Sequence, residues 1–342
     1  MKRINQEAYL AYAKKFTDKE RRLIAEFNEW LPEMIINCHA HCNLPEHVRF
    51  IDKRAYNHML STFPSFDLEE SNAWQKLFHP GKKIQTLRFA NVFQGIDHKA
   101  VNLYLLEKSN KQDKVALYGL PDDPSYTIKM LSHPRVSALK MYYMYLEPPA
   151  TKIYQFFPTA ILEEAQSRGI PIILHPPQQL VACLGQILEI TKDFPRLRIC
   201  LAHLALTKTI VAGLKEAFEA IAKIDSINLD TALVPSTGTI TLALKTIGPE
   251  KIMYGSDEPL HLIRSALYIH PQLGERLTTE YPYHWTKPSE HKQYKHFAIG
   301  SPHAHWRSLC ALKTAIATLP PKKQEAAKQK IFHDNAKSFY SF

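Results

Sequence analysis

The chain has 342 residues, of which 45% are hydrophobic and 22% charged, a composition that is ordinary for a soluble globular protein with a large core. Its formal net charge is +10, but the basic residues are scattered, so we expect no nucleic-acid partner and infer a positive field that attracts a small acidic substrate. The five cysteines are irregularly spaced and the N-terminal segment lacks an apolar run long enough for a signal peptide or membrane span; we therefore expect a cytoplasmic protein without disulfides or a membrane partner.

Residues 1–33 are predicted to form a helical extension ahead of the main domain, which is predicted to span residues 34–342. Apolar residues recur in the extension at helical spacing. Those expected on one side of the helix are Leu10, Phe16, Leu23, Ile24 and Phe27.

The stretch MIINCHAHCN, residues 34–43, is predicted to be the first strand, because a short apolar run follows a proline. Side chains alternate along a strand, so His39 and His41 should point to the same side and could chelate a metal together. By the same alternation, Cys38 and Cys42 should face away from the two histidines. Cys38 is expected to pack against the helix layer.

From Lys83 onward, short apolar strands alternate with helical segments. Seven further strands are predicted at residues 84–92, 114–118, 136–142, 171–175, 197–203, 226–230 and 251–257. Eight strands alternating with helices predict an α/β fold, a (β/α)8 TIM barrel, with a long insertion at about 261–302 after the eighth strand. A doubly wound open sheet is the alternative, but we find no Gly-rich phosphate loop after an early strand.

The predicted strands end in residues that can bind metals or move protons. These residues are His39 and His41 on the first strand, Lys140 on the fourth, His175 on the fifth, His203 on the sixth and Asp257 on the eighth. A single histidine is most often a satisfied core residue, but barrel enzymes place their chemistry at these strand ends. Three histidines and an aspartate suit an open catalytic site for one divalent metal, with Zn2+ favoured and Fe2+, Mn2+ or Co2+ as alternatives.

With these residues in place, the chain resembles the amidohydrolase superfamily, and within it the amidohydrolase-2 group of metal-dependent hydrolases and nonoxidative decarboxylases. The similarity runs from about Met34 to Tyr340. The matching pieces, in order, are INCHAH, SALKMY, GIPIILHP, FPRLRICLAHLA, PEKIMYGSDEP and IFHDNAKSFY.

The resemblance implies that His39, His41 and His175 are metal ligands, and that Asp257 is a fourth ligand or the acceptor of a proton from water. It also implies that His203 is a general acid/base or polarises the substrate. Two positions depart from the family pattern. Asn37 stands where the family usually has an aspartate two residues before the first histidine, and Glu258 stands where an aromatic or aliphatic residue often follows the aspartate.

Lys140 has two interpretations. Some superfamily members carbamylate a lysine of the fourth strand to bridge two metals, whereas the resembled group more often keeps one metal. Together with Arg49 and Arg88, Lys140 is our candidate for binding a substrate carboxylate. A second HxH pair, His303 and His305, lacks a preceding apolar strand, and we interpret it as a loop or a helix start.

The expected function is hydrolysis of a C–N or C–O bond in a small carboxylated or cyclic molecule by metal-activated water. The first alternative is nonoxidative decarboxylation of an aromatic or unsaturated acid, and the second is an inactive binding protein on the same barrel. The insertion at 261–302 is a candidate lid or homodimer contact.

Overall fold

The computed structural model describes residues 11, 14–50, 63, 65–283 and 286–342. Eight parallel strands are hydrogen-bonded in chain order, each to the next, as the sequence predicted for a (β/α)8 barrel. The strands are β1 (Met34–His41), β2 (Lys83–Phe89), β3 (Lys114–Tyr118), β4 (Val136–Tyr142), β5 (Ile172–His175), β6 (Ile199–Leu201), β7 (Ile227–Asp230) and β8 (Ile252–Met253).

The chain that follows β8 closes the barrel against β1, although it is not itself a regular strand. The amide of Cys38 donates to the carbonyl of Tyr254 at 3.0 Å, and the amide of His41 donates to the carbonyl of Glu258 at 2.9 Å. In the opposite direction, the amide of Asp257 donates to the carbonyl of His39 at 2.9 Å. These bonds bring Asp257 beside the histidines of β1, and the predicted barrel is confirmed.

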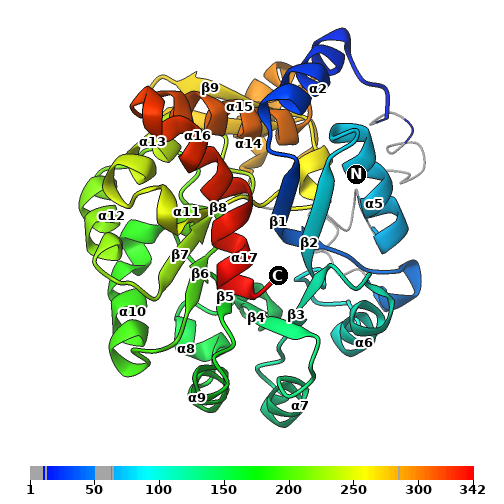
Figure 1. The fold of residues 1–342 in the computed structure, drawn as a ribbon, viewed down its shortest axis with the longest axis vertical. Coiled ribbons are helices and arrows are strands. Elements are labelled where there is room, and N and C mark those ends of the chain that lie inside the picture. The colour runs from blue at the N-terminus through cyan, green and yellow to red at the C-terminus, as the bar shows by residue number, and fades with distance from the viewer. Residues whose placement is uncertain (1–10, 12–13, 51–62, 64, 284–285) are drawn as a thin grey trace.

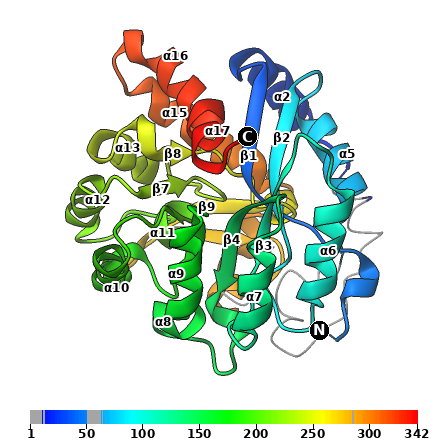
Figure 2. The same ribbon diagram turned by 60° about the horizontal axis from the view of Figure 1, so that its bottom comes forward.

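The connecting helices stand around the outside of the barrel (Figures 1 and 2). They are α5 (Leu68–Phe78), α6 (His98–Lys108), α7 (Pro124–Met130), α8 (Ile153–Phe156), α9 (Thr159–Ser167), α10 (Leu180–Asp193), α12 (Leu214–Ala222), α13 (Thr237–Thr246), α15 (Ala304–Ala317) and α16 (Pro321–Gln329). Several begin at an acidic cap: the carboxylates of Asp67, Asp97 and Asp123 accept amides at the starts of α5, α6 and α7.

The N-terminal extension contains helix α2 (Asp18–Trp30), which begins with a reciprocal capping box between Thr17 and Glu20. Phe27 is buried, and Leu23 and Ile24 are partly buried against the core, as expected for an amphipathic helix. Leu10 lies outside the described residues.

The interior of the barrel is filled by small and apolar side chains and is covered at one end by helix α17 (Asn335–Tyr340), drawn in red in Figure 1. The carbonyl of Phe339 accepts a hydrogen bond of 2.7 Å from Arg198, which directly precedes β6, so α17 lies at the N-terminal end of the strands. The interior residues are Ile36, Cys38, Leu87, Phe89, Ala116, Ala138, Ile173, Cys200, Ala202, Met253, Ala336, Phe339 and Tyr340.

The pairing of β1 with β2 shifts register between Asn37 and Ala40. Cys38 lies in the barrel interior, so our prediction that it packs against the helix layer was wrong. The irregularity is the reason, because it allows successive residues 38 and 39 to turn inward on a strand that would otherwise alternate. Cys42 does lie outside, among the residues between strands and helices.

The helical segment that ends the chain is interrupted. A π-helical turn, η6 (Lys330–Asp334), separates α16 from α17. The amide of Tyr254 donates to the carbonyl of Ile331 at 2.9 Å, and the side-chain amide of Asn335 donates to the carbonyl of Ile252 at 2.8 Å. The interruption thus ties the C-terminal helices to the segment that closes the barrel.

The insertion after β8 has regular structure of its own. It contains an antiparallel hairpin, β9 (Ser265–His270) and β10 (Gly274–Thr279), followed by helix α14 (Pro288–Tyr294). The remaining short helical turns of the described chain are α11 (His203–Leu206), η1 (Pro45–His47), η2 (Tyr143–Tyr145), η3 (Pro249–Lys251), η4 (Leu260–Leu262) and η5 (Lys295–Phe297). Within the described residues, no helix combines the length and the apolar character needed to cross a membrane.

Candidate metal centre and active site

A cavity of about 290 Å³ opens at the C-terminal ends of the strands. Six of the eight residues that the sequence proposed for the site line it, from three strands and two strand-following segments: His39, His41, Lys140, His175, His203 and Asp257. The other lining residues are Val92, Phe93, Tyr142, Tyr143, Gln179, Leu206, Lys208, Thr209, Leu260, Glu275, Arg276 and Leu277.

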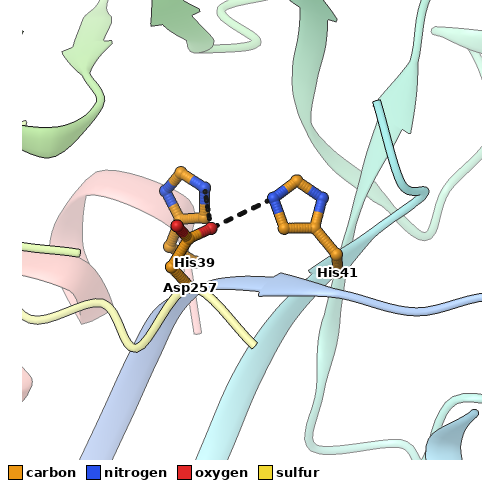
Figure 3. A group of neighbouring side chains, drawn as sticks. All are labelled: His39, His41 and Asp257. Atoms are coloured by element: carbon orange, nitrogen blue, oxygen red, sulfur yellow. Dashed lines mark ion pairs between the residues drawn. The ribbon is translucent and has the colours of Figure 1, made fainter. Parts of the chain in front are cut away.

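His39, His41 and Asp257 form the tightest group in this cavity. Nε2 of His39 lies 3.4 Å from Oδ1 of Asp257, and Nε2 of His41 lies 3.3 Å from the same oxygen. Figure 3 shows both imidazoles turned towards that carboxylate. One atom from each of the three residues lies within 4.8 Å of the others, which is close enough to surround a metal ion.

The opposite ring nitrogen of each histidine is hydrogen-bonded to an oxygen, which fixes the tautomer. Nδ1 of His39 pairs with Oδ2 of Asp230 at 2.9 Å, and Nδ1 of His41 pairs with the carbonyl of Ala90 at 3.0 Å. Because these oxygens accept, Nδ1 carries the proton and Nε2 keeps its lone pair for a metal. Nε2 of His39 is buried and has no hydrogen-bond partner in the described part of the chain, as expected for a metal ligand.

In His175 and His203 the Nδ1 atom is likewise hydrogen-bonded to an oxygen. Nδ1 of His175 pairs with the carbonyl of Pro176 at 3.0 Å, and Nδ1 of His203 pairs with the carbonyl of Ala232 at 2.7 Å. The ring centre of His203 lies 4.8 Å from that of His39 and 5.1 Å from that of His175. His175 therefore adjoins the compact group without belonging to it.

The buried environment sets the charges of these groups. Burial lowers the pKa of His203 to about 3, so this imidazole is neutral near pH 7. Burial alone would raise the pKa of Asp257, but the surrounding histidines, first of all His203, hold it well below its usual range. Near neutral pH the site thus combines the neutral imidazole of His203 with the ionised carboxylate of Asp257, and both are in the state that binds a divalent cation.

The backbone is strained at two of these residues. Asp257 has φ of 64°, and the four residues from His203 to Leu206 form a left-handed turn with φ between 49° and 59°. A left-handed turn costs non-glycine residues roughly 1–2 kcal/mol each. Oδ1 of Asp230 supports the turn by accepting the amide of His203 at 2.8 Å. Strain of this kind concentrates at functional sites, where the surrounding structure holds it.

Lys140 lies inside the cavity and is almost completely buried. Its ammonium stands 4.9 Å from the centre of the Phe89 ring, and burial lowers its pKa to about 8. At neutral pH most molecules thus carry a protonated Lys140, but the pKa is close to the range in which the lysine can lose its proton.

The structure does not bring the two predicted arginines to the cavity. Arg88 points outward from β2, where it is buried and bonded to Asp113 at 2.7 Å and to Ser71 at 2.7 Å. Arg49 is exposed and forms an ion pair with Asp97. Neither guanidinium lines the cavity, so their proposed contact with a substrate carboxylate has no support in the geometry.

Three lining or supporting residues escaped our sequence reasoning: Asp230, Lys208 and Arg276. Asp230 had a signal, because it ends the seventh predicted strand as a charged residue after an apolar run. Lys208 follows the left-handed turn and Arg276 belongs to the inserted hairpin, so only the tertiary structure places them at the site.

Comparison with known proteins agrees with the fold. The model of the amidohydrolase-2 family, described as Amidohydrolase, matches residues 78–342, which is more than half of the chain. The chain therefore belongs to this family of enzymes. The structural neighbours of the chain include hydrolases and decarboxylases. No curated protein sequence matches the chain.

Three similar solved structures illustrate the range. An amidohydrolase from Burkholderia multivorans with bound zinc is 11% identical, with a TM-score of 0.58 over 90% of this chain and 99% of that one. The 5-carboxyvanillate decarboxylase from Novosphingobium aromaticivorans, complexed with manganese and 4-hydroxy-3-methoxy-5-nitrobenzoic acid, is 12% identical, with a TM-score of 0.56 over 91% and 96%. A protein described as a 2-pyrone-4,6-dicarboxylic acid hydrolase from Pseudomonas putida is 15% identical, with a TM-score of 0.57 over 91% and 98%. At such identities these likenesses show the fold.

Proposed function

We propose that the protein is a metal-dependent hydrolase that cleaves a C–N or C–O bond in a small, carboxylated or cyclic substrate. The convergence of Nε2 of His39 and of His41 on the Asp257 carboxylate, at 3.4 and 3.3 Å, carries this proposal. It supplies two imidazole nitrogen ligands and a carboxylate that can accept a proton, side by side in one cavity.

The donor set fits one divalent metal. His39 and His41 would hold it through Nε2, with His175 on β5 and Asp257 in the segment after β8 completing the set. Imidazole and carboxylate ligands suit Zn2+, and two of the similar solved structures contain zinc and manganese. A divalent ion held here would lower the pKa of a coordinated water towards ~7.

The side chains would then move the protons. Asp257, ionised at neutral pH, accepts a proton from the attacking water and passes it to the leaving group. His203 keeps its proton on Nδ1 against Ala232, so its Nε2 can accept a proton but must gain one before it can stabilise a negatively charged oxygen. Lys140, which lines the cavity, offers a positive charge to the substrate.

Decarboxylation of an aromatic acid remains the second candidate, and the shape of the cavity favours it specifically. Phe93, Tyr142 and Tyr143 give the cavity an aromatic wall, and Tyr142 lies with its ring centre 4.8 Å from that of His175. An aromatic acid could stack on this wall while the same acid/base residues protonate the carbon that loses CO2.

One experiment separates the two reactions. Protein purified without added metal is analysed for metal, then the metal-loaded enzyme is incubated with lactones, cyclic amides and aromatic carboxylic acids in 18O-labelled water. Ring opening with label in the product supports the hydrolase. CO2 release without label in the organic product overturns it in favour of the decarboxylase. Absence of turnover with metal bound would indicate a binding protein.

Metal content tests the centre itself. We expect about one equivalent of metal in the wild type and none in a variant carrying His39→Ala and His41→Ala. Two equivalents together with a carbamylated Lys140 would replace the one-metal proposal by a two-metal centre. Asp257→Asn should abolish turnover of any substrate found, and near-normal turnover by this variant would refute the proposed mechanism.

A further inference from the structure

The inserted hairpin contributes a wall to the active-site cavity. Its second strand, β10, places Glu275, Arg276 and Leu277 on the lining of the cavity that also contains His39 and Asp257. Figure 2 shows strand β9 of the hairpin, in yellow, behind the barrel strands β3 and β4 in that view. An insertion that follows the eighth strand thus brings a guanidinium to the substrate space.

Arg276 is held by a carboxylate of the same insertion. Its Nε lies 3.2 Å and its Nη2 lies 3.4 Å from the two carboxylate oxygens of Glu290 on α14. Tyr268, which faces Arg276 across the hairpin, donates its hydroxyl to Glu290. The side chain of Arg276 is 40% exposed, whereas that of Glu290 is 15% exposed. Glu290 therefore orients the guanidinium of Arg276, and the exposed part of the side chain can be reached from the cavity.

These contacts leave Arg276 able to bind a second carboxylate. Charge-assisted hydrogen bonds are usually about 2.7–2.9 Å long, so the contacts with Glu290 are on the long side. A guanidinium has five N–H donors in a planar fork, and Glu290 engages two of its nitrogens. A planar carboxylate entering from the cavity could take a bidentate position.

The surrounding charges favour an anion at this place. Lys208 and Lys140 line the same cavity as Arg276. Lys208 and Leu277 also line a second small cavity together, which places this lysine next to β10. Two carboxylates, Asp257 and Glu275, oppose them, but Asp257 is engaged by the histidines. The lining therefore holds three cations and two carboxylates, and two of the cations, Arg276 and Lys208, lie at the hairpin side of the cavity.

We propose that Arg276, assisted by Lys208, is the recognition site for a substrate carboxylate that lies away from the bond being cleaved, and that Glu290 competes for the same guanidinium. This inference rests on the proposed function for the identity of the bound molecule as a substrate. It assigns to the insertion a role in specificity, and it predicts that substrates carry a carboxylate at the hairpin side of the cavity.

Calorimetric titration with isophthalate and with glutarate tests the proposal without turnover, and neutral isophthalamide serves as the uncharged probe. Arg276→Gln should weaken binding of both dianions about tenfold to a hundredfold, as expected for hydrogen bonds to a charged group, and leave isophthalamide unchanged. Glu290→Gln should strengthen binding of the dianions, because it removes the competing carboxylate. Arg49→Gln, which alters an arginine paired with Asp97 outside the cavity, is the matched control and should have no effect.

The titrations are repeated in the variant with His39→Ala and His41→Ala. Arg276→Gln should lower dianion affinity in that background too. The role of Arg276 can therefore be judged even if the proposed metal site is wrong. Equal binding of the dianions by wild type and Arg276→Gln, weaker binding by Glu290→Gln, or no binding by the wild type at millimolar concentration would each overturn the inference. The Glu290→Gln result stands by itself if Arg276→Gln fails to fold.

Discussion

The side-chain amide of Asn37 donates a hydrogen bond of 3.1 Å to the carboxylate of Glu258, and both residues are buried. These are the two positions at which the sequence departs from the pattern of the family it resembles. The contact explains why they depart together. An aspartate at position 37 would put a second carboxylate against Glu258, whereas an amide can donate to it.

We therefore predict that Asn37→Asp destabilises the protein by about 2–4 kcal/mol, because it places two buried carboxylates in contact. Adding Glu258→Gln should recover at least about 1 kcal/mol, since the new amide can donate to the new carboxylate. Chemical denaturation of the two single variants and the double variant gives the coupling energy. Strictly additive effects would show that the two departures are independent.

A second prediction concerns the link between Asp230 and His39. Asp230→Asn removes the charge that holds Nδ1 of His39 and weakens the support of the His203 turn. Loss of such a supporting contact typically lowers metal affinity about 10- to 100-fold, and we expect this loss in a competition titration with a chromophoric chelator.

Asp225→Asn is the matched control for this variant. Asp225 lies just before the same strand, is fully exposed and stands 3.6 Å from Lys251. Its substitution should leave metal affinity unchanged. A folded Asp230→Asn protein with wild-type affinity would show that Asp230 does not position His39.

The strand order and half of the strand ends could be predicted, because buried parallel strands are short apolar runs and barrel chemistry collects after them. The strands at 114–118 and 136–142 were predicted with their observed bounds. The eighth was predicted to reach Asp257, but the regular strand ends at Met253. Beyond it the chain bonds irregularly to β1, and Asp257 adopts a left-handed conformation that no strand pattern indicates.

The direction of individual side chains was harder to predict. Both faces of a barrel strand are buried, so apolar alternation does not reveal whether Arg88 points to the cavity or to the helices. The register shift that turns both Cys38 and His39 inward has no marker in the sequence. Arg276 reaches the site through the fold of an insertion, and the sequence shows only that this insertion exists.

A third prediction concerns the anchoring of the N-terminal helix. Glu20 of α2 is fully buried and accepts the amide of His303 at 2.9 Å, with Arg264 at 3.5 Å. Glu20→Gln should lower the free energy of unfolding at pH 7 by about 3 kcal/mol, because it leaves buried groups without their charged partner. Glu26→Gln on the same helix breaks only an exposed pair with Lys313 and should change stability by less than about 0.5 kcal/mol.

The pH dependence of this contact follows from its pKa. Burial alone would raise the pKa of Glu20, but His303 and Thr17 lower it from 4.5 to about 2. A lowered pKa gives stability that is fully present above pH 4.5 and is lost as the pH falls towards about 2. The stability difference between wild type and Glu20→Gln should therefore shrink between these values. A difference that stays constant down to the acid limit would contradict the role of the charge.

The last prediction concerns helix α17, and it tests whether packing at its end of the barrel affects metal binding at the other end. Phe339 of α17 is buried in the barrel interior at the end opposite the metal centre, and its ring lies 5.5 Å from the guanidinium of Arg198. Phe339→Ala should cost about 3–4 kcal/mol of stability, because it removes a large buried ring and leaves a cavity. Lys337→Ala, on the exposed side of α17, should cost less than about 0.5 kcal/mol.

Denaturation and metal titration are measured on the wild type and both variants, and Phe339→Ala should keep wild-type metal affinity while it remains folded. Loss of metal affinity in folded Phe339→Ala would show that the packing of α17 reaches the metal centre through the barrel interior.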